Sequence, residues 1–139
     1  MSETAKTSDT VALVLNRDLL FGSRLRNALS QLGLTPRFVP DATALAAAYR
    51  ETAADAVIAI IDMNSAVDWE VIKELAADAS GMPMLGFGPH VDVDQRRMAK
   101  AAGLTRIVSN GQFHAEMAEL IERYRRRKLP PGTIGASSP

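Results

Sequence analysis

Ala56–Asp62 reads AVIAIID, a run that is apolar at every position until its terminal carboxylate. A strand with one face in water alternates apolar and polar residues, whereas a strand covered by helices on both faces is apolar throughout. The run therefore predicts a buried strand in a parallel sheet. Ligands of such sheets gather beyond the carboxyl ends of the strands, so Asp62 is the first candidate site residue.

Short apolar runs on both sides of this strand alternate with helical patterns. Strands are expected at 11–15, 36–39, 56–61, 82–87 and 105–109, and the first helix at 19–32. Candidate stops and caps of the helices are Gly33 and Gly103 at C-terminal ends, and Asp41 or Thr43, Asp68, Asp92 or Asp94, and Asn110 at N-terminal ends. Five strand-then-helix units predict an α/β fold: a flavodoxin-like (βα)5 doubly wound parallel sheet with strand order 2-1-3-4-5.

Length and composition favour one domain. The 139 residues, 47% of them apolar, suffice for a single core, which we expect at 11–128. A flexible tail is expected at 1–10 and a disordered tail at 129–139, where prolines, glycines and serines concentrate. The polar start MSETAKTSDT differs from a signal peptide, and no apolar run reaches the roughly 18 residues of a membrane span. We expect a soluble, cytoplasmic protein.

Charge and cysteine content exclude several classes of function. Lysine plus arginine and aspartate plus glutamate each number 16, so no overall field attracts nucleic acid or an anionic membrane, and neither is expected as a partner. The sequence has no cysteine, which excludes disulfides, thiolate metal sites and thiol nucleophiles. We expect no cofactor.

Polar residues follow the predicted strands at one edge of the sheet. Asn16, Arg17 and Asp18 come after the first strand, and they should meet Asp62 at the switch point between the first and third strands. Gly88, His90 and Asn110 follow later strands on the same edge. Because the chain has two histidines and none is spaced as a second ligand, His90 is interpreted as a solvated turn residue.

Three segments make the chain resemble the receiver domain of bacterial response regulators. They are AVIAIID ending at Asp62, RNALSQLG at the end of the first helix, and AAG before the fifth strand. The resemblance covers residues 11–127. It implies the fold predicted above and a signalling role in a two-component system.

The resemblance breaks at the phosphorylation chemistry. In the family, an acidic pair after the first strand and the aspartate after the third hold magnesium, and that aspartate accepts a phosphoryl group. Asn16 and Arg17 stand where the acidic pair belongs, so an ion pair between Arg17 and Asp62 is predicted in place of the metal. If the register shifts by one residue, Asp18 and Asp62 would retain part of a metal site.

Other family positions have changed as well. The hydroxyl residue after the fourth strand and the lysine after the fifth align with Gly88 and Asn110, which supply neither a hydroxyl nor a charge. Ile107 occupies the position of the aromatic switch residue. The loop at 64–67 replaces a methionine-proline turn, and Trp69 stands where glycine is typical.

These departures predict a degenerate receiver, or pseudo-receiver. It would act by protein–protein interaction, without catalytic or metal residues and without phosphorylation by the standard magnesium-dependent route. One alternative is a phosphorylatable single-domain response regulator with Asp62 as acceptor. Another is a small-ligand-binding flavodoxin-like enzyme, although the turn NRDLLFGSR lacks the glycine spacing of a phosphate-binding loop.

The family resemblance also suggests a partner surface. It lies over the fourth helix, fifth strand and fifth helix, where a protein partner or a second copy would bind, and its exposed candidates are Arg96, Lys100, Arg106 and Gln112. The basic run RYRRRK, from Arg123 to Lys128, could be a nucleic-acid or lipid patch. It is interpreted as structural, because cations offset the dipole at a helix C-terminus and can pair with Glu116, Glu119 and Glu122.

Overall fold

Five parallel strands form one sheet in a computed structural model that describes residues 10–79 and 81–127. The elements alternate strictly along the chain: β1 (Val11–Leu15), α1 (Leu19–Gln31), β2 (Thr35–Val39), α2 (Ala42–Thr52), β3 (Ala56–Asp62), α3 (Trp69–Asp78), β4 (Met84–Gly88), α4 (Val93–Ala102), β5 (Arg106–Ser109) and α5 (Asn110–Tyr124). The strand order is β2-β1-β3-β4-β5. The predicted fold class and strand order are confirmed.

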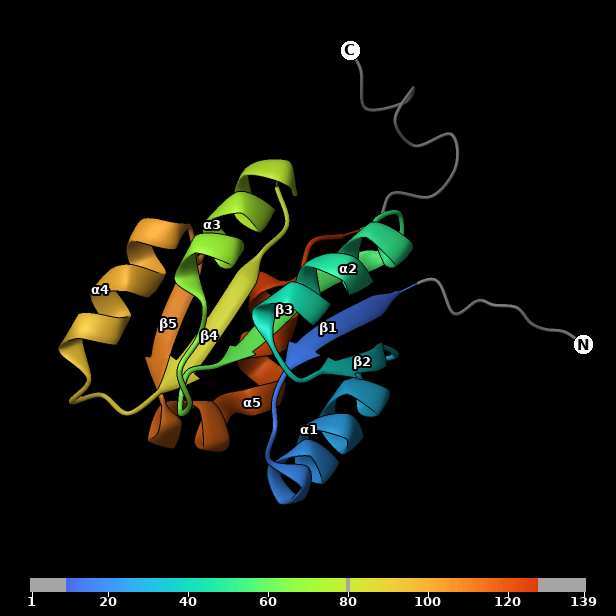
Figure 1. The fold of residues 1–139 in the computed structure, drawn as a ribbon. Coiled ribbons are helices and arrows are strands. Elements are labelled where there is room, and N and C mark those ends of the chain that lie inside the picture. The colour runs from blue at the N-terminus through green and yellow to red at the C-terminus, as the bar shows by residue number, and fades with distance from the viewer. Residues whose placement is uncertain (1–9, 80, 128–139) are drawn as a thin grey trace, which may run out of the picture.

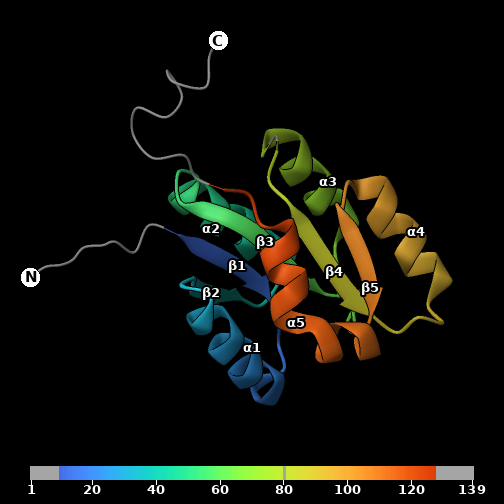
Figure 2. The ribbon, with the colours of Figure 1, turned by 180° about the vertical axis from the view of Figure 1, so that it is seen from behind.

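Helices cover both faces of the sheet. Figure 1 shows α2, α3 and α4 in front of the strands, and Figure 2 shows α1 and α5 on the opposite face. The side chains of β3 alternate between the two layers, with Ala59 and Ile61 in the first and Ile58 and Ile60 in the second. All of 56–61 is buried, which is why this strand is apolar without interruption.

Several predicted boundaries shift by one or two residues. β4 begins at Met84 instead of Met82, because Pro83 has no N–H for the ladder, although its carbonyl accepts a bond from the amide of Ala59. β5 begins at Arg106, one residue later than predicted. The cap of α5 is Ser109 and not Asn110, which leaves the Asn110 side chain available for other contacts.

The remaining caps follow the sequence pattern. Asp41, Asp68 and Asp92 accept bonds from the first-turn amides of α2, α3 and α4. Gly103 ends α4 with φ of 113°, a left-handed conformation that side chains with a Cβ rarely adopt.

The basic segment after α5 is bonded to the amino-terminal end of β3. The Arg126 guanidinium donates to the carbonyls of Ala53 (3.0 Å) and Ala56 (2.9 Å), and its backbone N–H donates to Val57 (2.8 Å). Arg125 reaches the carbonyl of Leu32 at 3.5 Å. These contacts support the structural interpretation of the segment.

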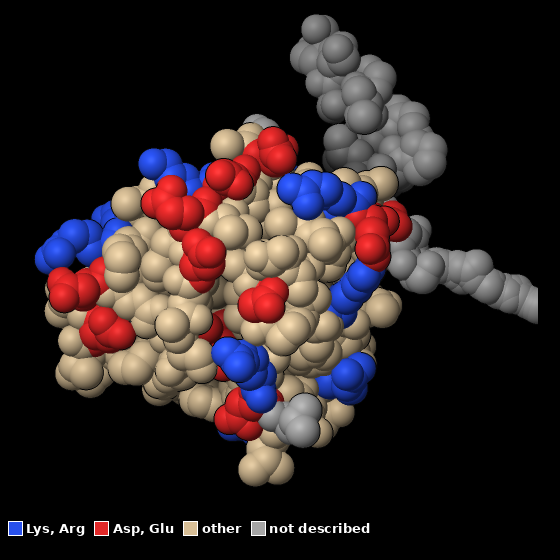
Figure 3. All heavy atoms as spheres, in the orientation of Figure 1, with Lys and Arg blue, Asp and Glu red and all other residues tan. Residues whose placement is uncertain are grey.

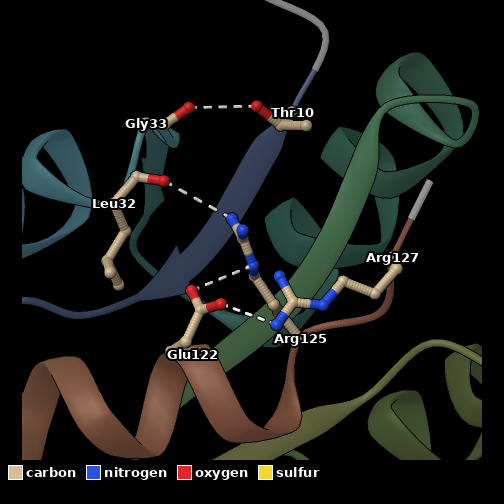
Figure 4. A network of polar contacts seen from close by, with 6 residues as sticks. All are labelled: Thr10, Leu32, Gly33, Glu122, Arg125 and Arg127. Atoms are coloured by element: carbon tan, nitrogen blue, oxygen red, sulfur yellow. Dashed lines mark hydrogen bonds and ion pairs between the residues drawn. The ribbon is translucent and has the colours of Figure 1, made fainter. Parts of the chain in front are cut away.

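Figure 4 shows the ion pairs of Glu122 with this basic segment and the hydrogen bond of Thr10 at the start of the described chain. Glu122 pairs with Arg125 (3.3 Å) and Arg127 (2.6 Å), whereas Glu116 and Glu119 make no ion pair with any other described residue. Thr10 donates from its hydroxyl to the Gly33 carbonyl at 3.0 Å.

The predicted tails lie mostly outside the described residues, which exclude 1–9 and 128–139 and with them Lys128. Among the helices of the described ranges, none is long and apolar enough to cross a membrane.

Candidate functional site

A hollow of about 420 Å³ lies beyond the carboxyl ends of β1, β3 and β5. β1 and β3 are neighbours in the sheet, so residues that follow them in the sequence meet here. The described lining comprises Arg17, Asp18, Phe21, Asp62, Asn64, Ser65, Phe87, Asn110 and His114. Four predicted site residues, Arg17, Asp18, Asp62 and Asn110, thus share one hollow.

The carboxylate of Asp62 accepts its hydrogen bonds from the loop that follows it. The Oδ1 atom of its half-buried side chain accepts hydrogen bonds from the backbone N–H and the side-chain Nδ2 of Asn64, both at 2.8 Å. A carboxylate can only accept, so it fixes which end of the Asn64 amide faces it. The sequence had suggested an altered loop at 64–67 but not this contact.

Asn64 also bonds to the start of α5. Its Nδ2 donates to Asn110 Oδ1 at 2.9 Å, and Asn110 Nδ2 donates back to Asn64 Oδ1 at 2.8 Å. We call this reciprocal pair the amide bridge. It joins the β3–α3 loop to the β5–α5 junction, and through Asn64 it connects both to Asp62.

The predicted ion pair between Arg17 and Asp62 is wrong. Among the ion pairs between described residues, none joins these two side chains, and Arg17 is exposed at the rim of the hollow. Asn64 lies two residues from Asp62, so its donors reach the carboxylate at little entropic cost. Holding a long arginine side chain there would restrict several bonds in return for a partly solvated charge contact.

Asn16 and Asp18 support the start of α1. Asp18 Oδ1 accepts bonds from the N–H groups of Leu20 (3.0 Å) and Phe21 (3.2 Å), as an N-cap does. Asn16 bonds the backbone of Asp18 through both ends of its amide. It lines a separate hollow beside Phe38 and not the one at Asp62.

The residues present do not fit a magnesium ion. Magnesium requires near-octahedral oxygen ligands, whereas Asp18 and Asp62 each use one carboxylate oxygen to accept N–H bonds, and Arg17 places a positive charge at the same hollow. Within the described ranges, no group of three or more His, Cys, Asp or Glu side chains could hold a metal.

Gly88 has no room for a side chain. A Cβ atom built there would lie 2.9 Å from the Cβ of Met63, closer than real Cβ contacts. Met63 is held in place because its N–H donates to the Phe87 carbonyl (2.8 Å) and its carbonyl accepts from Gln95 Nε2 (2.7 Å). Met63, the first residue of the β3–α3 loop, therefore occupies the space that a hydroxyl side chain at position 88, the end of β4, would need.

The two histidines differ in setting. His90 is exposed in the turn after β4, as expected of a solvated residue. His114 lines the hollow and was not singled out from the sequence. Its ring makes an edge-to-face contact with the ring of Phe21, with centroids 5.0 Å apart, and its Nδ1 lies 3.0 Å from Arg24 Nη1. Because arginine only donates, this Nδ1 accepts.

The candidate interface residues divide into two places. Arg96, Lys100 and Arg106 line one groove between α4 and β5. Gln112 lies in the first turn of α5, where its N–H donates to the Ser109 cap, and it is not part of that groove lining.

Solved structures with a similar arrangement include response regulator receiver domains. The chemotaxis protein CheY4 of Vibrio cholerae has a TM-score of 0.69 at 15% identity, with 83% of this chain and 98% of that chain covered. A response regulator receiver domain protein from Clostridium thermocellum has a TM-score of 0.69 at 15% identity, with coverages of 82% and 92%. The chain has the receiver-domain fold.

A third receiver domain gives a comparison with a metal-bound cleft. The receiver domain of the sensor histidine kinase PA1611 from Pseudomonas aeruginosa PAO1, with magnesium coordinated in its active site cleft, has a TM-score of 0.69 at 14% identity, covering 83% of this chain and 96% of that one. No protein-family model and no curated protein matches the sequence. At these identities the likeness establishes the receiver-domain fold and not its chemistry.

Proposed function

We propose that this chain is a pseudo-receiver, a signalling domain that acts through protein–protein contact without magnesium-dependent phosphorylation of Asp62. The amide bridge carries this proposal. Asp62 accepts two hydrogen bonds from Asn64, and Asn64 is in turn paired with Asn110. One carboxylate oxygen of the residue at the family's acceptor position is thus bound by neutral donors from the protein itself.

The charge balance of the hollow supports the same proposal. A phosphoryl group on Asp62 would bring about two negative charges, which working receivers neutralise with a metal ion and a lysine. Here Asn110 offers a dipole in place of the lysine charge. The position of the hydroxyl donor is Gly88, and Met63 fills the space beside it. The exposed guanidinium of Arg17 is the one cation beside Asp62 in the described lining.

The receiver-like surface over α4, β5 and α5 is the proposed contact surface. These three elements carry the four candidate residues Arg96, Lys100, Arg106 and Gln112. None of the four belongs to the described lining of the hollow at Asp62. The partner is a protein or a second copy of the chain.

Amide NMR spectra with magnesium and beryllofluoride test the proposal. Beryllofluoride mimics a phosphoryl group, so a working acceptor site shows saturable shifts around its aspartate. We expect wild type and the variant Asp62→Asn to respond equally, with no saturable shifts at Asp62, Asn64 or Asn110. Saturable shifts in wild type that Asp62→Asn abolishes would favour the phosphorylatable alternative and end the proposal.

A thermal unfolding panel tests the enzyme alternative. A ligand that binds only the native state raises the unfolding midpoint, so flavins or nucleotides would stabilise a flavodoxin-like enzyme. We expect the midpoint to stay unchanged across the panel.

A further inference from the structure

A groove between α4 and β5 combines cations with apolar side chains. Its volume is about 480 Å³. The described lining comprises Val93, Arg96, Arg97, Lys100, Leu104, Thr105, Arg106 and Ile107. We call it the basic groove. It contains four cations and no carboxylate among those residues, in a chain whose positive and negative side chains balance at 16 each.

Three of the four cations have no anionic partner among the residues that the structure describes. Arg97 pairs with Asp94 at 3.2 Å, but no ion pair between described residues includes Arg96, Lys100 or Arg106. Figure 3 shows Lys and Arg side chains over α4 at the left edge of the view, with Asp and Glu side chains just below them. The positive charges of these three side chains are therefore not paired with a carboxylate of the described residues, and they add up locally at the groove.

The clustering opposes stability. Arg96 and Lys100 stand four residues apart on α4, and like charges at that spacing destabilise a helix by about 0.2–0.5 kcal/mol. Lys100 alone has a compensating role, because it lies in the last turn, where a cation offsets the helix dipole. The same dipole role does not apply to Arg96, which lies before the last turn of α4, or to Arg106 at the start of the edge strand β5.

Apolar side chains stand at the same groove. Val93 is 59% exposed, Leu104 lies at the base with 8% exposure, and Ile107 is partly exposed on the edge strand. A nucleic-acid backbone would use the cations and leave these apolar groups in water. A peptide segment can bury the apolar groups while its carboxylates meet the cations.

We propose that the basic groove docks an acidic segment of a partner protein that also carries apolar side chains. This inference rests on the proposed function, because it names the chemistry of the partner of a protein-interaction domain. The cations of the groove would bind the acidic side chains of the partner segment, and Val93 and Ile107 would pack against its apolar side chains.

The test is an NMR titration of the full chain with a short synthetic peptide in which glutamates flank leucines. We expect saturable shifts at the amides of Val93, Lys100 and Ile107, weakened by added salt because exposed charges are screened. The same peptide with lysine for glutamate, or with serine for leucine, should bind at least several-fold more weakly. Equal binding of either, or no shifts at the groove with the first peptide, would overturn the proposal.

A matched pair of charge reversals locates the contact. Lys100→Glu and Arg50→Glu each replace a cation in the last turn of a helix, so both lose the same dipole contribution. Lys100→Glu should weaken peptide binding by about three- to tenfold, and Arg50→Glu should leave it unchanged. Equal weakening by both variants would indicate a general charge effect and refute the groove.

Other occupants give different results. A short DNA duplex that binds the groove more tightly than the acidic peptide would replace the proposal with nucleic-acid binding. Self-association that Lys100→Glu abolishes would replace it with a second copy. Beryllofluoride shifts at Asp62 concern only the proposed function, so the two ideas can fail separately.

Discussion

Asp62 shows how a carboxylate can be held without a cation. Both of its donors come from Asn64, and the second amide hydrogen of Asn64 goes to Asn110. A metal ion entering the hollow would share the carboxylate with these donors and would be repelled by the charge of Arg17. Hydrogen bonds to charged groups contribute about 1.5–3 kcal/mol each when buried, and less at a half-buried group such as this one.

Gly88 gives a test of the closed space beside this site. Gly88→Ala places a Cβ 2.9 Å from Met63 Cβ, and the resulting overpacking should lower the free energy of unfolding by about 1–3 kcal/mol. Gly111→Ala is the matched control, because its nearest neighbour is the Ser109 hydroxyl at 4.0 Å and helical alanine is favoured over glycine by about 0.5–1 kcal/mol. Urea denaturation measures both. Equal stabilities of the two variants would show that Met63 moves aside freely.

Helix α5 makes hydrogen bonds to other parts of the fold at both of its ends. Its N-cap Ser109 leaves Asn110 free for the amide bridge, and the residues after its last turn bond the far end of the sheet. One helix thus connects the carboxyl-terminal ends of the strands, where the site lies, with the amino-terminal end of β3. The basic residues that end it belong to this connection.

Arg126 gives a test of that connection. Arg126→Lys retains the charge but loses the planar group that reaches the carbonyls of Ala53 and Ala56 together, so we expect a loss of about 0.5–1.5 kcal/mol for each lost bond. Arg123→Lys is the control, because Arg123 is exposed on α5. Thermal unfolding should separate the two variants. A similar midpoint for both would mean that the Arg126 bonds contribute little.

The molecule as a whole has two apolar layers that share one sheet. One layer lies between the sheet and α2, α3 and α4, and the other between the sheet and α1 and α5. The strands contribute alternate side chains to each, so loss of packing in one layer reaches the other through the sheet. Cooperative unfolding is therefore expected.

Ile121 and Trp69 together test this cooperativity, since they lie on opposite faces. Ile121 is fully buried on α5, and Trp69, the single tryptophan, packs in the layer of α3. Ile121→Val should lower stability by about 0.5–1.5 kcal/mol. Trp69 fluorescence and far-ultraviolet circular dichroism should report the same shift in urea midpoint. Val91→Ala, at a 74% exposed position, should change neither. A Trp69 transition that stays in place while the dichroism moves would show that the layers unfold independently.

Local patterns were enough to predict the elements and their order. The unbroken apolar run at 56–61 requires cover on both faces, and the alternation of strands and helices leaves few topologies. The same topology predicts that Asn16, Arg17, Asp18 and Asp62 converge with Asn110 nearby, because the strands of a parallel sheet end on the same side. All of these except Asn16 line one hollow. The residue that caps a helix depends on local backbone geometry, and α5 is capped by Ser109 and not by the predicted Asn110.

The sequence alone determines the helices, the strands and their order, because these depend on which side chains avoid water over a few neighbouring residues. The hydrogen-bond partner of each polar side chain is set only by the tertiary structure. Asn64 meets Asn110 across 46 residues, and Met63 closes the space at Gly88, only because packed loops bring these atoms within about 3 Å. Charge alone favoured Arg17 as the partner of Asp62, and the folded loop supplied a nearer donor. Hydrogen bonds are sensitive to fractions of an ångström, and such distances exist only after the layers have packed.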